Sequence, residues 1–153
     1  GGTPRAVLAR LAADAPSDDT VVAVAREALA EATAFVADHE LITLYPDPVE
    51  LIVMPEIHRG VAVAYCDPPG ALDPPDAPTF FAISPTPAGW SPERVASFYR
   101  EYNVHAMRNL VIHEAMPGHV LQLAHSRRGP VPTKVHQAFW NGPFVEGWAV
   151  YAE

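Results

Sequence analysis

The chain has 153 residues, is 49% hydrophobic and carries a formal net charge of −8. This length and apolar content suffice for one ordinary core, so a single domain is expected over residues 1–153, as a piece of a longer chain because it opens on Gly1-Gly2 without Met. The acidic balance excludes nucleic acid as a partner, and no apolar run approaches the roughly 20 residues that span a membrane. One cysteine, Cys66, cannot form an internal disulfide and favours a reducing, cytoplasmic location.

The first zone, residues 1–41, is rich in alanine and predicts helices. Pro4 suits a first helical turn, and the oxygens of Ser17-Asp18-Asp19 are suited to cap a second helix. The apolar residues after them recur at the i, i+3, i+4 spacing of an amphipathic helix that packs in a bundle. They are Val21, Val24, Ala25, Ala28, Leu29, Ala32, Phe35 and Val36.

The middle zone, residues 42–90, holds ten of the 17 prolines. It predicts strands at 49–54, 61–65 and 79–83, which are rich in β-branched or aromatic residues, with Asp-Pro-Pro turns at 67–70 and 73–76. We expect a small antiparallel sheet or an extended arm. Its role is either that of a structural hairpin or that of an edge holding a peptide in extended form.

The last zone, residues 91–153, returns to helix. Ser91 and Pro92 are a good cap and first residue for one helix, and another is expected to run from about Val104 into His113. Further helical segments are expected at 121–124, at 133–140, and after Gly142-Pro143, where the last helix carries Glu146.

Histidines and acidic residues gather in this zone in a pattern typical of hydrolytic zinc centres. Five of the seven histidines follow position 103, and the stretch from 104 contains only three acidic residues, Glu114, Glu146 and Glu153. In the familiar His-Glu-x-x-His arrangement, the two histidines share one helix face and one zinc ion. Here His113 and His119 are six residues apart, so a straight helix would point them about 120° apart.

The residues between the two histidines predict a distortion that removes this objection. Pro117 cannot donate to the carbonyl of His113, and the residue before a proline is pushed out of the helical region. Gly118 adopts backbone angles closed to other residues. We therefore expect a bulge that returns His119 to the face of His113. Glu146 is then the natural third zinc ligand, and Glu114 is the general base that takes a proton from the metal-bound water.

The strings HEAMPGHVLQ (113–122) and FVEGWAVYAE (144–153) resemble the two signature segments of the bacterial family called domain of unknown function 885. That family is placed among zincin-like metallopeptidases of the gluzincin type. The resemblance implies a mainly α fold, that is, a helical zincin-like metallopeptidase core with a small Pro-rich β hairpin or arm. It also implies zinc-dependent hydrolysis of peptide substrates, with roles for His113, Glu114, His119 and Glu146.

Four further residues are candidates to orient a ligand or bind substrate. Glu153 lies two helical turns after Glu146 on nearly the same face, and Gln122 lies one turn after His119. Tyr151 and His105 are candidates to polarise a scissile carbonyl.

Two alternatives stay open at this stage. The chain is a non-catalytic helical binding or structural module if the metal site is incomplete. Two histidines and a carboxylate also occur in iron oxygenases, although the glutamate beside the first histidine suits hydrolysis better.

Overall fold

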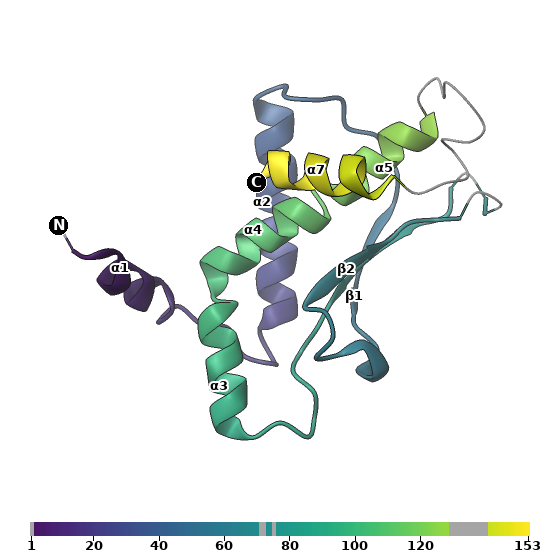
Figure 1. Cartoon of the computed structure of the whole chain (residues 1–153). Coiled ribbons are helices and arrows are strands. Elements are labelled where there is room, and N and C mark those ends of the chain that lie inside the picture. The colour runs from purple at the N-terminus through teal and green to yellow at the C-terminus, as the bar shows by residue number, and fades with distance from the viewer. Residues whose placement is uncertain (1, 71–72, 75, 129–140) are drawn as a thin grey trace.

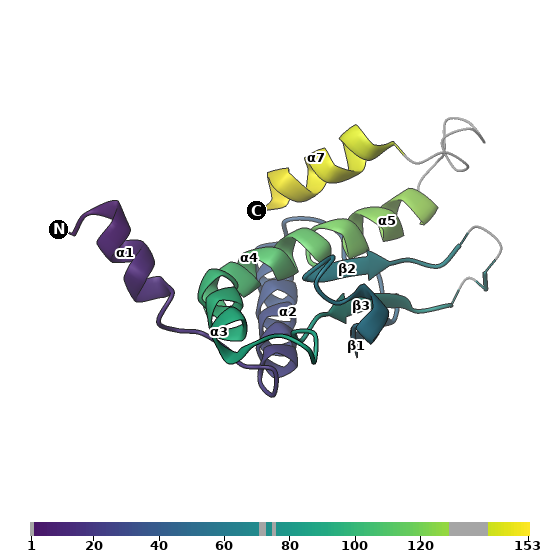
Figure 2. The ribbon, with the colours of Figure 1, turned by 60° about the horizontal axis from the view of Figure 1, so that its bottom comes forward.

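The computed structural model describes residues 2–70, 73–74, 76–128 and 141–153. The chain is mainly α-helical with a small sheet. Helix α4 (Val104–Glu114) is continued by α5 (His119–Arg128), and α7 (Gly142–Ala152) lies along both on the side away from the sheet (Figure 2). Helix α2 (Val21–Asp38) packs between α4 and the sheet, whereas α1 (Pro4–Leu11) projects from the body (Figure 1).

Side-chain caps set where the later helices begin. Helix α3 (Pro92–Glu101) starts after Ser91, whose hydroxyl accepts from the Arg94 N–H. Asn103 accepts from the first N–H groups of α4, and Asn141 accepts from Phe144 at the start of α7. These contacts satisfy N–H groups that have no partner within the helix.

The expected cap of α2 is wrong. The helix begins at Val21 after Thr20, which makes no side-chain capping bond. Asp18 does not cap it, because its carboxylate accepts hydrogen bonds from the Thr86 N–H and from both the Thr86 and Tyr99 hydroxyls. Asp18 therefore joins the start of α2 to the segment before α3 and to α3 itself.

Within the described residues, three strands form one sheet in the order β1-β3-β2: β1 (Val49–Val53), β2 (Ala64–Asp67) and β3 (Thr79–Ile83). The expectation of an antiparallel sheet is correct for β2 and β3 but wrong for β1, which runs parallel to β3. The chain reverses direction between β1 and β2 and again between β2 and β3. The central strand, β3, is the most buried of the three. Burial of both faces explains why the least polar strand lies there.

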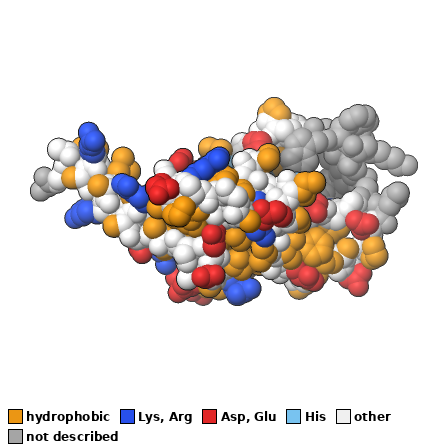
Figure 3. All heavy atoms as spheres, turned by 90° about the horizontal axis from the view of Figure 1, so that it is seen from below, with side chains coloured by type: hydrophobic (Ala, Val, Ile, Leu, Met, Phe, Trp, Pro, Cys, Tyr) orange, Lys and Arg blue, Asp and Glu red, His pale blue; other side chains and the backbone are white. Residues whose placement is uncertain are grey.

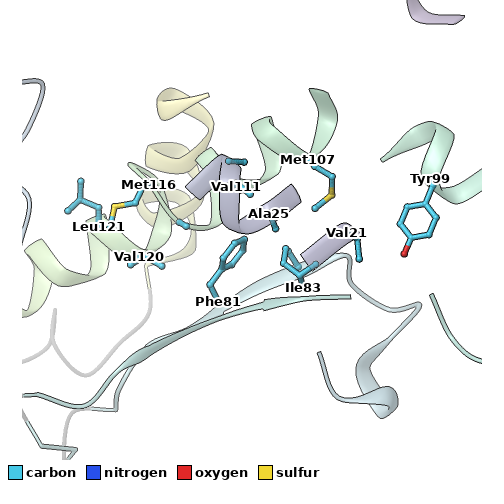
Figure 4. Packing of buried hydrophobic residues seen from close by; sticks show 13 residues of the cluster. Val21, Ala25, Phe81, Ile83, Tyr99, Met107, Val111, Met116, Val120 and Leu121 are labelled. Carbon is cyan, nitrogen blue, oxygen red and sulfur yellow. The ribbon is translucent and has the colours of Figure 1, made fainter. Parts of the chain in front are cut away.

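The core lies between the sheet, α2 and α4. Phe81 and Ile83 project from β3 toward Val21 and Ala25 of α2 and toward Val111 of α4 (Figure 4). Met116, Val120 and Leu121 extend the same cluster toward α5. The junction between α4 and α5 is therefore held in the hydrophobic core, which fixes the backbone around the two histidines.

Charged side chains are interspersed with apolar ones on the face seen in Figure 3. This distribution agrees with a solvated acidic surface. None of the helices that the structure describes is long and apolar enough to cross a membrane. The helix expected at 133–140 lies outside the described residues.

Candidate metal centre

The two histidines flank a wide turn that joins α4 to α5. Helix α4 ends at Glu114, and the Gly118 N–H then donates to the carbonyl of Ile112, six residues back, at 2.9 Å. The Leu121 N–H donates to the Ala115 carbonyl, also six residues back, at 3.3 Å. An α-helix makes these bonds four residues back, so the junction contains two extra residues. Because of these two extra residues, His113 and His119 face each other although they are six residues apart, as two residues four apart do in a regular helix.

The turn requires glycine at position 118 because a side chain would not fit there. A Cβ at this position would lie 1.8 Å from the carbonyl oxygen of His113 and 2.3 Å from that of Ile112. Gly118 does not adopt the left-handed region, since the described glycine with positive φ is Gly60. Gly118 acts by close approach of backbone to backbone.

The turn places His113 and His119 side by side, and α7 brings Glu146 to them. The two ring centroids lie 4.8 Å apart with the rings nearly perpendicular. One ligand atom from each of His113, His119 and Glu146 lies within 4.8 Å of the others. The Oε2 atom of Glu146 is 3.6 Å from Nε2 of His113 and 3.5 Å from Nε2 of His119.

These separations fit a shared cation better than hydrogen bonds. Hydrogen bonds between nitrogen and oxygen are usually 2.7–3.2 Å long, whereas two ligands of a tetrahedral zinc ion, each about 2.0–2.1 Å from it, lie roughly 3.4 Å apart. Two imidazoles and a carboxylate are also donors that zinc commonly takes. The donor set therefore fits zinc, and the two separations from Glu146 to the histidines match the spacing of zinc ligands, whereas the whole group lies within 4.8 Å.

Glu153 binds the far side of the His113 ring. Its Oε1 lies 2.6 Å from Nδ1 of His113, and its Oε2 accepts from the Asn109 side-chain amide at 3.0 Å. An ionised carboxylate only accepts, so Nδ1 carries the proton. In the neutral ring, Nε2 then presents its lone pair toward Glu146, the state that a metal ligand requires.

His119 is the most enclosed of the three candidate ligands, with a side chain that is 8% exposed. Burial lowers the pKa of His119, and nearby His113 lowers it further, although the Glu146 carboxylate opposes both. A lower pKa favours the neutral ring that binds metal. Its Nδ1 is buried and has no hydrogen-bond partner among the described residues.

Glu114 lies between the histidines and the sheet. Burial raises the pKa of Glu114 to about 7, with a smaller contribution from the Glu146 carboxylate, while His113 and a hydrogen bond from the Cys66 backbone lower it. A bound cation would lower this pKa as well. Burial and the nearby Glu114 carboxylate raise the pKa of the Cys66 thiol to about 12, so it is a poor nucleophile.

A contact that the sequence pattern did not indicate ties α7 to the turn. The indole Nε1–H of Trp148 donates to the carbonyl of Pro117 at 2.8 Å. A tryptophan side chain has one hydrogen-bond donor, and the sequence does not show which acceptor it meets. This bond is therefore visible only in the three-dimensional structure.

The other predicted residues are not part of the cluster. His105 is exposed at the start of α4, where its Nε2 lies 3.6 Å from Asp14. Tyr151 is 82% exposed and lies about 140° around α7 from Glu146, because five residues separate them. Gln122 is buried and donates to Ser126, while its Oε1 has no partner among the described residues.

Two hollows of different character lie on the described surface. The larger, about 810 Å³, is lined mainly by small apolar residues between α1 and α3 and contains no histidine. The smaller, about 330 Å³, adjoins the cluster and is bounded by Tyr102, Leu110, Glu114 and Glu153. We associate the candidate site with the smaller hollow, because His113, Glu114 and Glu153 line it, although His119 and Glu146 are not part of its lining.

Comparison with known proteins identifies the family. The model of the family described as "Bacterial protein of unknown function (DUF885)" matches residues 1–153, so the chain belongs to this family. A solved structure, described as that of "a putative lipoprotein of unknown function from Shewanella oneidensis", is 34% identical and superposes with a TM-score of 0.80. The match covers 97% of this chain and 25% of the other, so the chain spans a quarter of that protein's length. A search of curated proteins finds no match.

Proposed function

We propose that the chain is the metal-binding part of a zincin-like peptidase of the gluzincin type, in which His113, His119 and Glu146 hold a zinc ion. The observation that carries the proposal is the convergence of these three donors within 4.8 Å beside the buried carboxylate of Glu114. Zinc at this position would polarise the carbonyl of a peptide bond and lower the pKa of a water molecule toward about 7.

Glu114 is the general base in this proposal. Its neighbour His113 is a proposed ligand, and the Cys66 N–H donates to the Glu114 carboxylate, which limits its orientations. Glu114 accepts a proton from the attacking water and returns it to the nitrogen of the leaving peptide. Glu153 holds the His113 ring through Nδ1, so that Nε2 stays directed at the ion.

The edge of the sheet beside Glu114 is suited to a peptide substrate. Among the described strands, β2 pairs only with β3. The Ser84 N–H donates to the Val63 carbonyl, so alternation along antiparallel strands turns the backbone groups of Ala64 and the Cys66 carbonyl to the free edge as pairing groups, while the Cys66 N–H is engaged by Glu114. Cys66 is also the residue that contacts Glu114. An extended peptide added along this edge would lie next to the proposed catalytic centre.

The test is hydrolysis by the intact zinc-loaded protein. Its rate on a mixture of internally quenched peptides is compared with that of Glu114→Gln. Both proteins are expected to bind one zinc ion, while the variant hydrolyses peptides about 10²–10⁴-fold more slowly. Bound zinc without hydrolysis by the unaltered protein would favour a non-catalytic module, and selective retention of iron would favour an oxygenase.

Cellular location needs its own measurement. The single Cys66 predicts the cytoplasm, whereas the name of the structural relative points to the cell envelope. Lipoproteins are held to membranes by acyl chains. Fractionation of the native bacterium into cytoplasm and membrane, followed by immunodetection, separates the two predictions.

A further inference from the structure

We infer that Trp148 is a positioning residue of the metal centre, which fixes the rotation of α7 about its own axis and thereby the place of Glu146. The inference rests on the proposed metal site, but it concerns a contact outside the ligand set. Trp148 donates to the Pro117 carbonyl at 2.8 Å, within the turn that connects the two histidines.

The distribution of residues around α7 gives Trp148 this role. Val145 and Ala149 are buried and define the face that packs on α4 and α5. At about 100° per residue, Glu146 lies on one flank of this face, roughly 100° from Val145, and Trp148 lies on the other, roughly 60° away. The helix is therefore held on both sides of its apolar contact.

The flank that carries Glu146 is tied to α4. Glu153, two turns after Glu146, contacts His113 and Asn109 at 2.6 and 3.0 Å. Among the hydrogen bonds of the described residues, the one from Trp148 on the opposite flank is the one that joins α7 to the turn itself. Val145 and Ala149 are small side chains, so they offer little volume to interlock with α4 and α5 and resist rolling weakly. The hydrogen bond from Trp148 to Pro117 limits the rotation of α7 about its axis.

The geometry of the site is sensitive to such a roll. The Cα atoms of a helix lie about 2.3 Å from its axis and carboxylate oxygens lie several ångströms further out, so a rotation of 10–20° moves Oε2 by about 1 Å. Glu146 Oε2 lies 3.5–3.6 Å from two nitrogen atoms at once, and zinc bonds tolerate deviations of about 0.2 Å. Release of Trp148 from Pro117 would thus weaken ion binding without removing a ligand.

The test is the zinc affinity of Trp148→Phe in the intact protein, measured by competition with a chromophoric chelator. Phenylalanine keeps an aromatic ring but has no N–H donor. Affinity is expected to fall about tenfold, within the range found for residues that orient metal ligands. Trp90→Phe is the matched control, because Trp90 contacts Arg94 and Phe98 on α3, and its zinc affinity should be unchanged.

A double-mutant cycle separates positioning from general loss of structure. Trp148→Phe is repeated in a Glu146→Gln background, where misplacement of residue 146 matters less, and there the further loss should be less than twofold. Equal losses in both backgrounds, or no loss in either, would overturn the inference. Trp148→Leu, which also lacks a donor, replaces the phenylalanine variant if that variant fails to fold without zinc. Absence of zinc binding by the unaltered protein would instead refute the proposed metal site.

Discussion

The Oε1 atom of Glu153 lies 2.6 Å from Nδ1 of His113, although 40 residues separate them. The contact joins the end of α7 to α4 at Nδ1, whereas Glu146 lies near Nε2 of the same ring. It determines which ring nitrogen carries the proton and therefore which one is free to bind a cation. Both carboxylates thus act on His113 from one helix, Glu146 facing Nε2 and Glu153 holding Nδ1.

Replacement of Glu153 by Gln tests this arrangement. The amide keeps the shape of the side chain but loses the charge, so we expect zinc affinity to fall about 10–100-fold while the fold is retained. Zinc competition titrations and circular dichroism measure the two effects. Glu101→Gln makes the same change at the end of α3 and should leave affinity as it is; equal affinities for all three proteins would contradict the role of Glu153.

Removal of any one ligand should have a larger effect than removal of Glu153. For His113→Ala, His119→Ala and Glu146→Ala, we expect zinc affinity to fall on the order of 10²–10³-fold, because each ligand contributes a few kcal/mol of binding. Isothermal titration or chelator competition measures the loss. His105→Ala, which removes only an exposed contact with Asp14, is the control. A comparable loss for His105→Ala would show that the histidines act through something other than a shared site.

Gly118→Ala tests the wide turn between the histidines. The added Cβ would meet the His113 carbonyl at 1.8 Å, so we expect a loss of about 3 kcal/mol or more in unfolding free energy and weaker zinc binding. Gly147→Ala is the matched control on α7, where nothing lies within 4 Å of an added Cβ. That variant should be as stable as the parent or more stable by about 0.5–1 kcal/mol. Urea denaturation of the zinc-free proteins gives both values.

Local sequence signals predicted the later helices well, and the structure brings the three predicted ligands His113, His119 and Glu146 within 4.8 Å of one another. The caps at Ser91 and the Gly142-Pro143 start of α7 depend on neighbouring residues, which sequence shows directly. The spacing of His113 and His119 also predicted a distortion, because the chemistry of Pro117 is local. These features needed no knowledge of distant parts of the chain.

Interactions between distant segments account for what sequence reasoning missed. Asp18 was assigned to cap a helix, but hydrogen bonds from Thr86 and Tyr99 engage its carboxylate. Helical spacing alone gave no partner for His105 or Tyr151, and the packed helices show that His105 lies 3.6 Å from Asp14 and that Tyr151 is 82% exposed. The contact from Trp148 to Pro117 likewise depends on how α7 sits against the turn.

The Asp18 contacts predict a dependence of stability on pH. Although burial raises the pKa of Asp18, the hydrogen bonds from Tyr99 and Thr86 outweigh it and hold the pKa below its usual value. The stabilisation is therefore present above the unfolded-state pKa of about 3.9 and is lost as the pH falls through the lower folded-state pKa. At neutral pH, Asp18→Asn should cost about 1 kcal/mol, because hydrogen bonds to a charged acceptor are strong but solvent screens this exposed carboxylate.

Urea denaturation in the presence of a chelator, from pH 7 down to about pH 2.5, measures this difference between Asp18→Asn and the parent. The two curves should converge at the acid end. A difference that is the same at pH 3 and at pH 7 would rule out a contribution from the ionised carboxylate. Asp19→Asn provides the control at an exposed neighbouring position.

Zinc K-edge X-ray absorption of the zinc-loaded intact protein shows whether both histidines bind the ion. We expect a first shell of nitrogen and oxygen atoms at about 2.0–2.1 Å with the outer-shell scattering of two imidazoles, one of which disappears in His119→Ala. A shell without imidazole, or no zinc retained after dialysis, would contradict a metal centre formed by His113, His119 and Glu146.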